Sequence, residues 1–416
     1  MSPATDRRDV PVLFSTRILR LFAYGFLSVV LALYLQAAGL SESAIGLLLT
    51  LTLVGDTVIS LWITTQADRI GRRRMLIAGA GLMIFAGVLF AATHSFWLLL
   101  VAATVGVISP SGNEVGPFLA IEQAALSEKT PGDRRIRVFA WYNLVGSFAT
   151  ASGALAGGLL AQGLQGAGVG LLASYRAVVV GYAAMGLVLG ALFTRLTPAV
   201  ESAATGPAVA PRVRLGLHRS RGVVLKLAAL FSLDAFGGGL VVQSIVAYWF
   251  HVRFGVPPAV LGGIFFGANV LAGVSALAAA RIASRIGLLN TMVFTHLPSN
   301  VLLLLVPLMP TLPLAITVLL LRFSISQMDV PTRQSYTMAV VSPDERSAAA
   351  GVTGVARTTG AALAPVFTGP LLADPALLGV PFLLAGSLKI IYDLVLYRSF
   401  RSLRPEGSEL KAEGDH

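Results

Sequence analysis

The sequence predicts an all-α membrane protein whose twelve transmembrane helices form two parallel-repeat bundles of six. Composition is the first reason: 55% of the 416 residues are hydrophobic and only 12% are charged, whereas soluble proteins carry about 25% charged residues. The second reason is a repeat. Residues 67–74 read ADRIGRRR, and residues 283–290 read ASRIGLLN, each between long apolar runs. A duplicated membrane half is how many secondary transporters are built.

Twelve apolar runs are long enough to cross a bilayer, which takes about 20 helical residues. Helices are expected because an open strand leaves backbone groups unpaired in hydrocarbon. Turn-forming residues such as Gly39 and Gly255, which the repeat also aligns, separate the runs. The predicted spans are residues 18–37, 45–66, 75–93, 96–126, 136–163, 175–195, 223–251, 258–283, 290–309, 313–341, 347–373 and 379–397.

Charge predicts the orientation. Most of the 31 Lys and Arg side chains fall on one side if both termini are cytoplasmic, as the positive-inside rule requires. We therefore expect a multi-pass protein of the cell (inner or plasma) membrane. The predicted parts are a six-helix bundle at 1–196, a cytoplasmic linker at 197–222, a second six-helix bundle at 223–398 and a polar tail at 399–416.

The repeat extends into the spans. Residues 109–115 of the fourth span read SPSGNEV and align with SISQMDV at 324–330 of the tenth. The alignment places an acid, Glu114 or Asp329, at the same depth in both halves. Ionisable groups inside a membrane are costly and usually functional, so both acids are candidates for a role in transport.

With these twelve spans and two halves, the chain resembles the major facilitator superfamily of secondary transporters. The signature of that family after the second span is G-x-x-x-D-R/K-x-G-R/K-R/K, and residues 64–73 read TTQADRIGRR. The resemblance implies that Asp68 caps the start of the eleventh helix when the inner side is closed. The alternative is a basic loop that only fixes orientation. The candidate gating motif consists of Asp68, Arg69, Gly71, Arg72 and Arg73.

The resemblance also implies that the first, fourth, seventh and tenth spans line a central cavity. A buried acid is more readily neutral than one in water, so it can carry protons. The candidate proton carriers are Glu114, Asp329, Asp234 and Asp56. The candidate substrate contacts are Asn113, Ser111, Arg322, Ser326, Arg333, Arg357, Tyr24, Gln243, Tyr248 and Trp141. As an alternative, the arginines neutralise Glu114 and Asp329, and these pairs are structural.

The predicted function is secondary active transport of a small organic solute by alternating access, coupled to protons. The resemblance implies export, because drug/proton antiporters of this family often carry a Gly-Pro-rich signature in the fifth span, and residues 146–158 keep its glycines but lack its proline. Close helix packing explains the same small residues. Proton-coupled uptake of an organic anion is the alternative. A membrane-embedded enzyme or receptor is a remote one, because the serines and acids of the repeat have no histidine nearby.

The expected partners follow from this function. They are the lipid bilayer, a small-molecule substrate and protons, with no nucleic acid and a monomer as the functional form. No phosphate-binding loop motif occurs, so a proton gradient rather than ATP is the expected driving force. No cofactor or metal is expected, since there is no cysteine and the five histidines show no ligand spacing.

Overall fold

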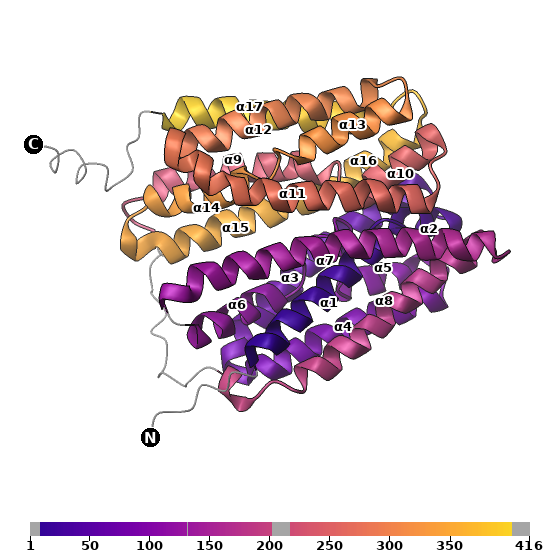
Figure 1. Cartoon of the computed structure of the whole chain (residues 1–416), viewed down its shortest axis with the longest axis horizontal. Helices are drawn as coiled ribbons and strands as arrows, with labels where there is room; N and C mark the ends of the chain where they lie inside the picture. Colours follow the sequence, from indigo (N-terminus) through magenta and orange to yellow (C-terminus); the bar gives the residue numbers. More distant parts are fainter. Residues whose placement is uncertain (1–8, 131, 202–216, 402–416) are drawn as a thin grey trace, which may run out of the picture. The chain divides into compact units, whose positions relative to one another are not determined.

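A computed structural model of the chain describes residues 9–130, 132–201 and 217–401 (Figure 1). Over these ranges every regular element is a helix, which confirms the predicted all-α membrane fold. Most of the predicted linker and tail, residues 202–216 and 402–416, lies outside the described residues.

Seven crossings are single helices: α3 (Glu42–Ile70), α4 (Arg72–Ala92), α7 (Gly132–Gly166), α8 (Leu171–Phe193), α11 (Pro258–Ile286), α12 (Leu288–Leu305) and α17 (Val380–Phe400). Five are broken into pairs: α1 (Asp9–Ser28) and α2 (Leu31–Ala37), α5 (Phe96–Val105) and α6 (Phe118–Lys129), α9 (Arg221–Gly239) and α10 (Gln243–Phe254), α13 (Leu312–Phe323) and α14 (Asp329–Ala339), and α15 (Arg346–Leu363) and α16 (Pro365–Ala373). Short 3-10 turns are η1 (Pro198–Val200), η3 (Val306–Leu308) and η4 (Pro343–Glu345).

Nine segments of the described chain are long and apolar enough to cross a membrane unaided. The three broken pairs α5–α6, α13–α14 and α15–α16 complete the twelve crossings. Helix α1 begins at Asp9, well before the predicted start at residue 18. Its polar first turns are stabilised by contacts of Asp9, whose carboxylate binds Lys129 and the amide of Thr197 at 2.9 Å.

The segments that the repeat aligns are the helix breaks themselves. The fourth crossing is interrupted between α5 and α6, and the tenth between α13 and α14. In the fourth crossing, Gly112 and Gly116 have positive φ angles of 70° and 82°, a conformation that glycine adopts without steric cost. Discontinuous helices are typical of transporter binding sites, so the break marks the place to look for function.

Contacts divide the chain into two units. Unit 1 comprises Met1–Pro207, Val242–Val270 and Pro365–Leu378. Unit 2 comprises Ala208–Val241, Leu271–Ala364 and Gly379–His416. Unit 1 thus contains the first sequence half together with α10, the start of α11 and α16. The predicted domain boundaries, which follow the sequence halves, stay a prediction.

Small residues bring helices of unit 1 into close contact. A Cβ atom at Gly153 of α7 would lie 2.0 Å from the backbone oxygen of Phe22 on α1, and one at Gly25 would lie 2.1 Å from the oxygen of Thr150. Such contacts are possible only without a side chain. The glycine-rich stretch of the fifth span therefore serves helix packing, one of its two predicted uses.

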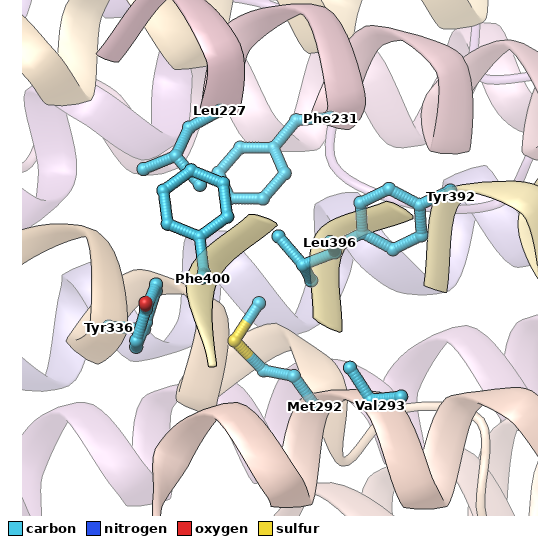
Figure 2. Close-up of a cluster of buried hydrophobic side chains, with 8 residues drawn as sticks. All are labelled: Leu227, Phe231, Met292, Val293, Tyr336, Tyr392, Leu396 and Phe400. Atoms are coloured by element: carbon cyan, nitrogen blue, oxygen red, sulfur yellow. The ribbon is translucent and has the colours of Figure 1, made fainter. Parts of the chain in front are cut away.

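Unit 2 is held by an aromatic core. Helices α12 and α17 run side by side (Figure 1). Figure 2 shows how side chains of α9, α12, α14 and α17 interlock in this core. Phe231 and Tyr392 pack edge to face, as do Tyr336 and Phe400. This core fixes the helices that carry the charged residues of unit 2.

Candidate functional site

Glu114 is neutralised by arginines of α1. Its carboxylate contacts Arg17 and lies 2.8 Å from Nε of Arg20. Arg20 also binds Glu122 through two contacts of 2.7 and 2.8 Å, and the side chains of both residues are fully buried. Two arginines thus balance two carboxylates. The sequence prediction missed Arg17 and Arg20, although their spacing of three residues places them on one helix face.

Asp56 lies at the midpoint of α3 and has no cationic partner in the described part of the chain. One carboxylate oxygen accepts a hydrogen bond from the amide of Gly116 at 2.7 Å and another from the hydroxyl of Ser60 at 3.2 Å. Within the described ranges no Lys, Arg or His forms an ion pair with it. Because Gly116 belongs to the break between α5 and α6, Asp56 is attached directly to that break.

Other groups of unit 1 hold the same break. Tyr24, fully buried on α1, donates to the backbone oxygen of Val115 at 3.0 Å. The amide of Asn113 donates to the hydroxyl of Ser111 at 3.3 Å, while the side chain of Asn113 is exposed. Trp141 is 57% exposed, whereas its neighbour Tyr142 is buried and donates to Glu122.

In unit 2, Asp234 and Asp329 are both ion-paired. Asp234 lies 2.6 Å from Nζ of Lys389 and 3.2 Å from Nη1 of Arg333. The same Nη1 atom lies 3.0 Å from Asp329. His296 extends the network through Nδ1, which lies 2.9 Å from Asp393. We call these six side chains the unit 2 ion cluster: Asp234, His296, Asp329, Arg333, Lys389 and Asp393.

The ion cluster contains a geometrically plausible metal-ligand set. Ligand atoms of Asp234, His296 and Asp329 lie within 4.8 Å of one another. However, Lys389 and Arg333 already contact the two carboxylates, and a divalent ion there would lie beside two positive charges. The donor set therefore fits a salt-bridge network rather than a metal site.

Three predicted substrate contacts of unit 2 have unsatisfied polar atoms. Nε of Arg322, Nε of Arg357 and Oγ of Ser326 are each buried without a hydrogen-bond partner in the described part of the chain. Neither arginine forms an ion pair there. Arg322 lies in the last turn of α13, shortly before the break that contains Ser326, and Arg357 lies in the middle of α15. Arg333, by contrast, is occupied by its two aspartates.

Gln243 and Tyr248 belong to a seam within unit 1. Gln243 lies beside the break between α5 and α6, where the amide of its neighbour Ser244 donates to the backbone oxygen of Pro110 at 3.0 Å. Nε2 of Gln243 donates to the hydroxyl of Ser28 at 2.8 Å. The hydroxyl of Tyr248 donates to Glu42 at 2.8 Å and accepts from Nε2 of Gln36 at 3.0 Å. We call these five side chains the end seam, because they join residues 28–42 of the first sequence half to α10 of the second. Gln36, Glu42 and Tyr248 of the end seam lie near the α2–α3 loop, whereas Ser28 and Gln243 lie beside the break between α5 and α6.

The predicted gating motif packs against its own unit. The guanidinium of Arg72 binds Glu128 through two contacts of 2.8 and 2.9 Å. Glu201 accepts hydrogen bonds from the amides of Arg72 and Arg73, the latter at 3.3 Å. Gly71, with a φ of 115°, forms the turn, and Arg69 is exposed. The side chain of Asp68 lies outside the described residues, so its capping role stays a prediction.

Comparison with known proteins matches a single family over most of the chain. The profile of the Major Facilitator Superfamily matches residues 13–410. An uncharacterised membrane protein of Saccharomyces cerevisiae is 32% identical over 418 residues, covering 94% of this chain and 93% of its own. A quinolone resistance protein, NorA of Staphylococcus aureus, is 23% identical over 155 residues, covering 37% of this chain and 39% of its own.

The fold is also found among solved structures. The crystal structure of a D-xylose–proton symporter superposes with a TM-score of 0.72 at 15% sequence identity. The match covers 94% of this chain and 97% of the symporter. At this identity the likeness concerns the fold alone.

Proposed function

Since the chain belongs to the Major Facilitator Superfamily, a family of transporters rather than enzymes, we propose that it is a proton-coupled secondary transporter in which Asp56 carries the proton. One observation supports this most strongly. Of the four predicted carriers, Glu114, Asp234 and Asp329 are ion-paired, whereas Asp56 has no cationic partner among the residues that the structure describes. An isolated carboxylate inside a membrane is costly when charged, so it exchanges protons more readily than a paired one.

Asp56 is placed to couple protonation to movement. As an anion it holds the amide of Gly116 at 2.7 Å, and hydrogen bonds to ionised acceptors are the stronger ones. Protonation weakens that bond and loosens the break between α5 and α6. The break carries Ser111 and Asn113, which are predicted substrate contacts. Proton binding thereby changes the shape of the predicted substrate site.

The proposed transport cycle is alternating access of a monomer in the cell membrane, with both termini cytoplasmic. In that orientation Gln36, Glu42 and Tyr248 of the end seam lie toward the outer face. A protein that is closed at this seam exchanges solute with the cytoplasm. Opening the seam is the step that gives the solute site access to the outside instead. The end seam therefore takes the role of an outer gate.

Two directions of coupling are supported by different observations. The partial similarity to a quinolone resistance protein favours proton-driven export, since a transporter confers resistance by removing the drug. The unpaired Arg322 and Arg357 favour the second candidate, proton-coupled uptake of an organic anion. The sign of the solute movement in a pH gradient separates the two.

The test uses the purified chain reconstituted on a solid-supported membrane. A pH gradient is imposed while anionic, cationic and neutral solutes are applied in turn. Asp56→Asn should abolish gradient-driven movement of the responding solute, yet keep exchange of labelled for unlabelled solute. The control is Asp344→Asn, the same change at a side chain that is 63% exposed. Gradient-driven movement retained in Asp56→Asn contradicts the proposal.

A further inference from the structure

We propose that Arg322 and Arg357, together with Ser326, form a binding site for the anionic group of the transported solute, a carboxylate or a phosphate. This site deepens the proposed function, because it names the class of substrate, but it does not depend on Asp56. The starting observation is that Nε of both arginines and Oγ of Ser326 are buried without partners in the described structure. Unsatisfied buried donors are costly and call for a ligand.

The acids of unit 2 do not supply the missing partner. Both arginines lie within electrostatic range of Asp234 and Asp329. Those carboxylates are nevertheless held at 2.6–3.2 Å by Lys389 and Arg333. Asp393, the third acid, is held by His296 and by Nδ2 of Asn300 at 2.9 Å. Arg322 and Arg357 therefore approach an ion cluster in which each of the three acids already has a partner.

A count of charges gives the same result. Three carboxylates, Asp234, Asp329 and Asp393, face four basic side chains when Arg322 and Arg357 are added to Arg333 and Lys389. One positive charge is in excess while His296 is neutral. An excess charge inside a membrane protein is unfavourable until an anion neutralises it. The preferred ligand is thus an anion rather than a cation.

Depth argues against a lipid headgroup as the ligand. Arg322 lies in the last turn of α13, near the middle of the crossing that runs from Leu312 to Ala339. Arg357 is eleven residues into α15, which continues through α16 to Ala373. Headgroups lie at the ends of a crossing. A solute that enters the protein reaches this depth, and the planar fork of a guanidinium matches carboxylate and phosphate oxygens.

The test measures anion binding directly on the full chain in detergent. Inorganic phosphate and citrate, at constant ionic strength set with chloride, should raise the melting temperature of the wild type in a concentration-dependent way. Arg322→Gln and Arg357→Gln should each weaken the apparent affinity roughly tenfold or more. Arg281→Gln, the same change at an exposed arginine of unit 2, should bind as the wild type does.

Two further variants test whether the guanidinium group itself, rather than its charge alone, binds the anion. Arg322→Lys and Arg357→Lys retain the charge and the fold but lose the fork, so they should bind more weakly than the wild type. The proposal is overturned if neither phosphate nor citrate stabilises the wild type, or if the arginine variants bind equally well. Stabilisation by phosphatidylglycerol in nanodiscs but not by the soluble anions also overturns it.

Discussion

The four acids that the sequence selected differ in their neighbours rather than in their chemistry. Glu114 is paired with arginines about 95 residues earlier in the chain, and Asp234 with a lysine 155 residues later. The sequence could place each acid at membrane depth, because apolar runs surround it. It could not identify the paired ones, because the partners approach only after folding. Asp56 emerged as the unpaired acid by this comparison alone.

The pairing of Asp234 predicts a stability effect. Lys389→Met removes the contact at 2.6 Å and leaves a buried carboxylate partly uncompensated, which should cost about 2–3 kcal/mol. The double variant with Asp234→Asn should recover most of that loss, since the carboxylate that lost its lysine is removed and Arg333 keeps Asp329 as its partner. Melting temperatures in detergent measure both the loss of stability in Lys389→Met and its recovery in the double variant. Lys226→Met, at an exposed lysine of α9, serves as the control. A double variant no more stable than Lys389→Met would contradict the account.

At the scale of elements, carboxylates stabilise two helix starts near the ends of the crossings. Glu201 accepts from the first amides of α4, as described above. Glu345 accepts from the amides of Arg219 and Ser220, both at 2.8 Å, and from that of His218, at the start of α9. A carboxylate at a helix N-terminus is favourable because it satisfies unpaired amides and interacts with the helix dipole. The sequence showed the acids but not which helix each one caps.

Glu345 makes stability depend on pH. Burial opposes ionisation, but hydrogen bonds from Ser220, His218 and Arg219 lower the pKa of the Glu345 carboxyl from 4.5 to about 2. A lowered pKa in the folded state stabilises the fold above the ordinary carboxyl value, and this contribution is lost as pH falls from about 4.5 through about 2.

Glu345→Gln should therefore melt at a lower temperature than the wild type at about pH 7. This difference in melting temperature should shrink as pH falls below about 4.5. Thermal unfolding scans across pH measure it. Asp344→Gln alters the adjacent acid, which is 63% exposed, and should show a much smaller difference. If the difference in melting temperature between Glu345→Gln and the wild type stays constant down to about pH 3, the pH-dependent stabilisation by Glu345 is ruled out.

At the scale of the whole molecule, the repeat was the most informative feature of the sequence. It predicted twelve crossings and the equivalence of residues 109–115 and 324–330, and these segments are helix breaks in both halves. The sequence did not predict that α10, the start of α11 and α16 share a unit with the first half. That association depends on contacts such as Gln243 with Ser28, which no periodicity encodes.

The end seam predicts that cross-linking arrests transport. The chain has no cysteine, so Ser28→Cys with Gln243→Cys gives one reactive pair, suited to a short thiol-reactive linker. Linking should lower transport at least tenfold, and reduction should restore it, because the seam must open in each cycle. The matched control is Gln165→Cys with Ser174→Cys, whose side chains lie 2.9 Å apart within the first half. Full transport by the linked seam would exclude a gate there.

The central claim is that Asp56 binds and releases the transported proton. It is tested most directly by infrared difference spectroscopy of the reconstituted protein as pH is changed, a measurement that needs no substrate. A carboxyl band should titrate in the wild type, disappear in Asp56→Asn and persist in Asp234→Asn. A titrating band unchanged by Asp56→Asn, or one removed by Asp234→Asn instead, would contradict it.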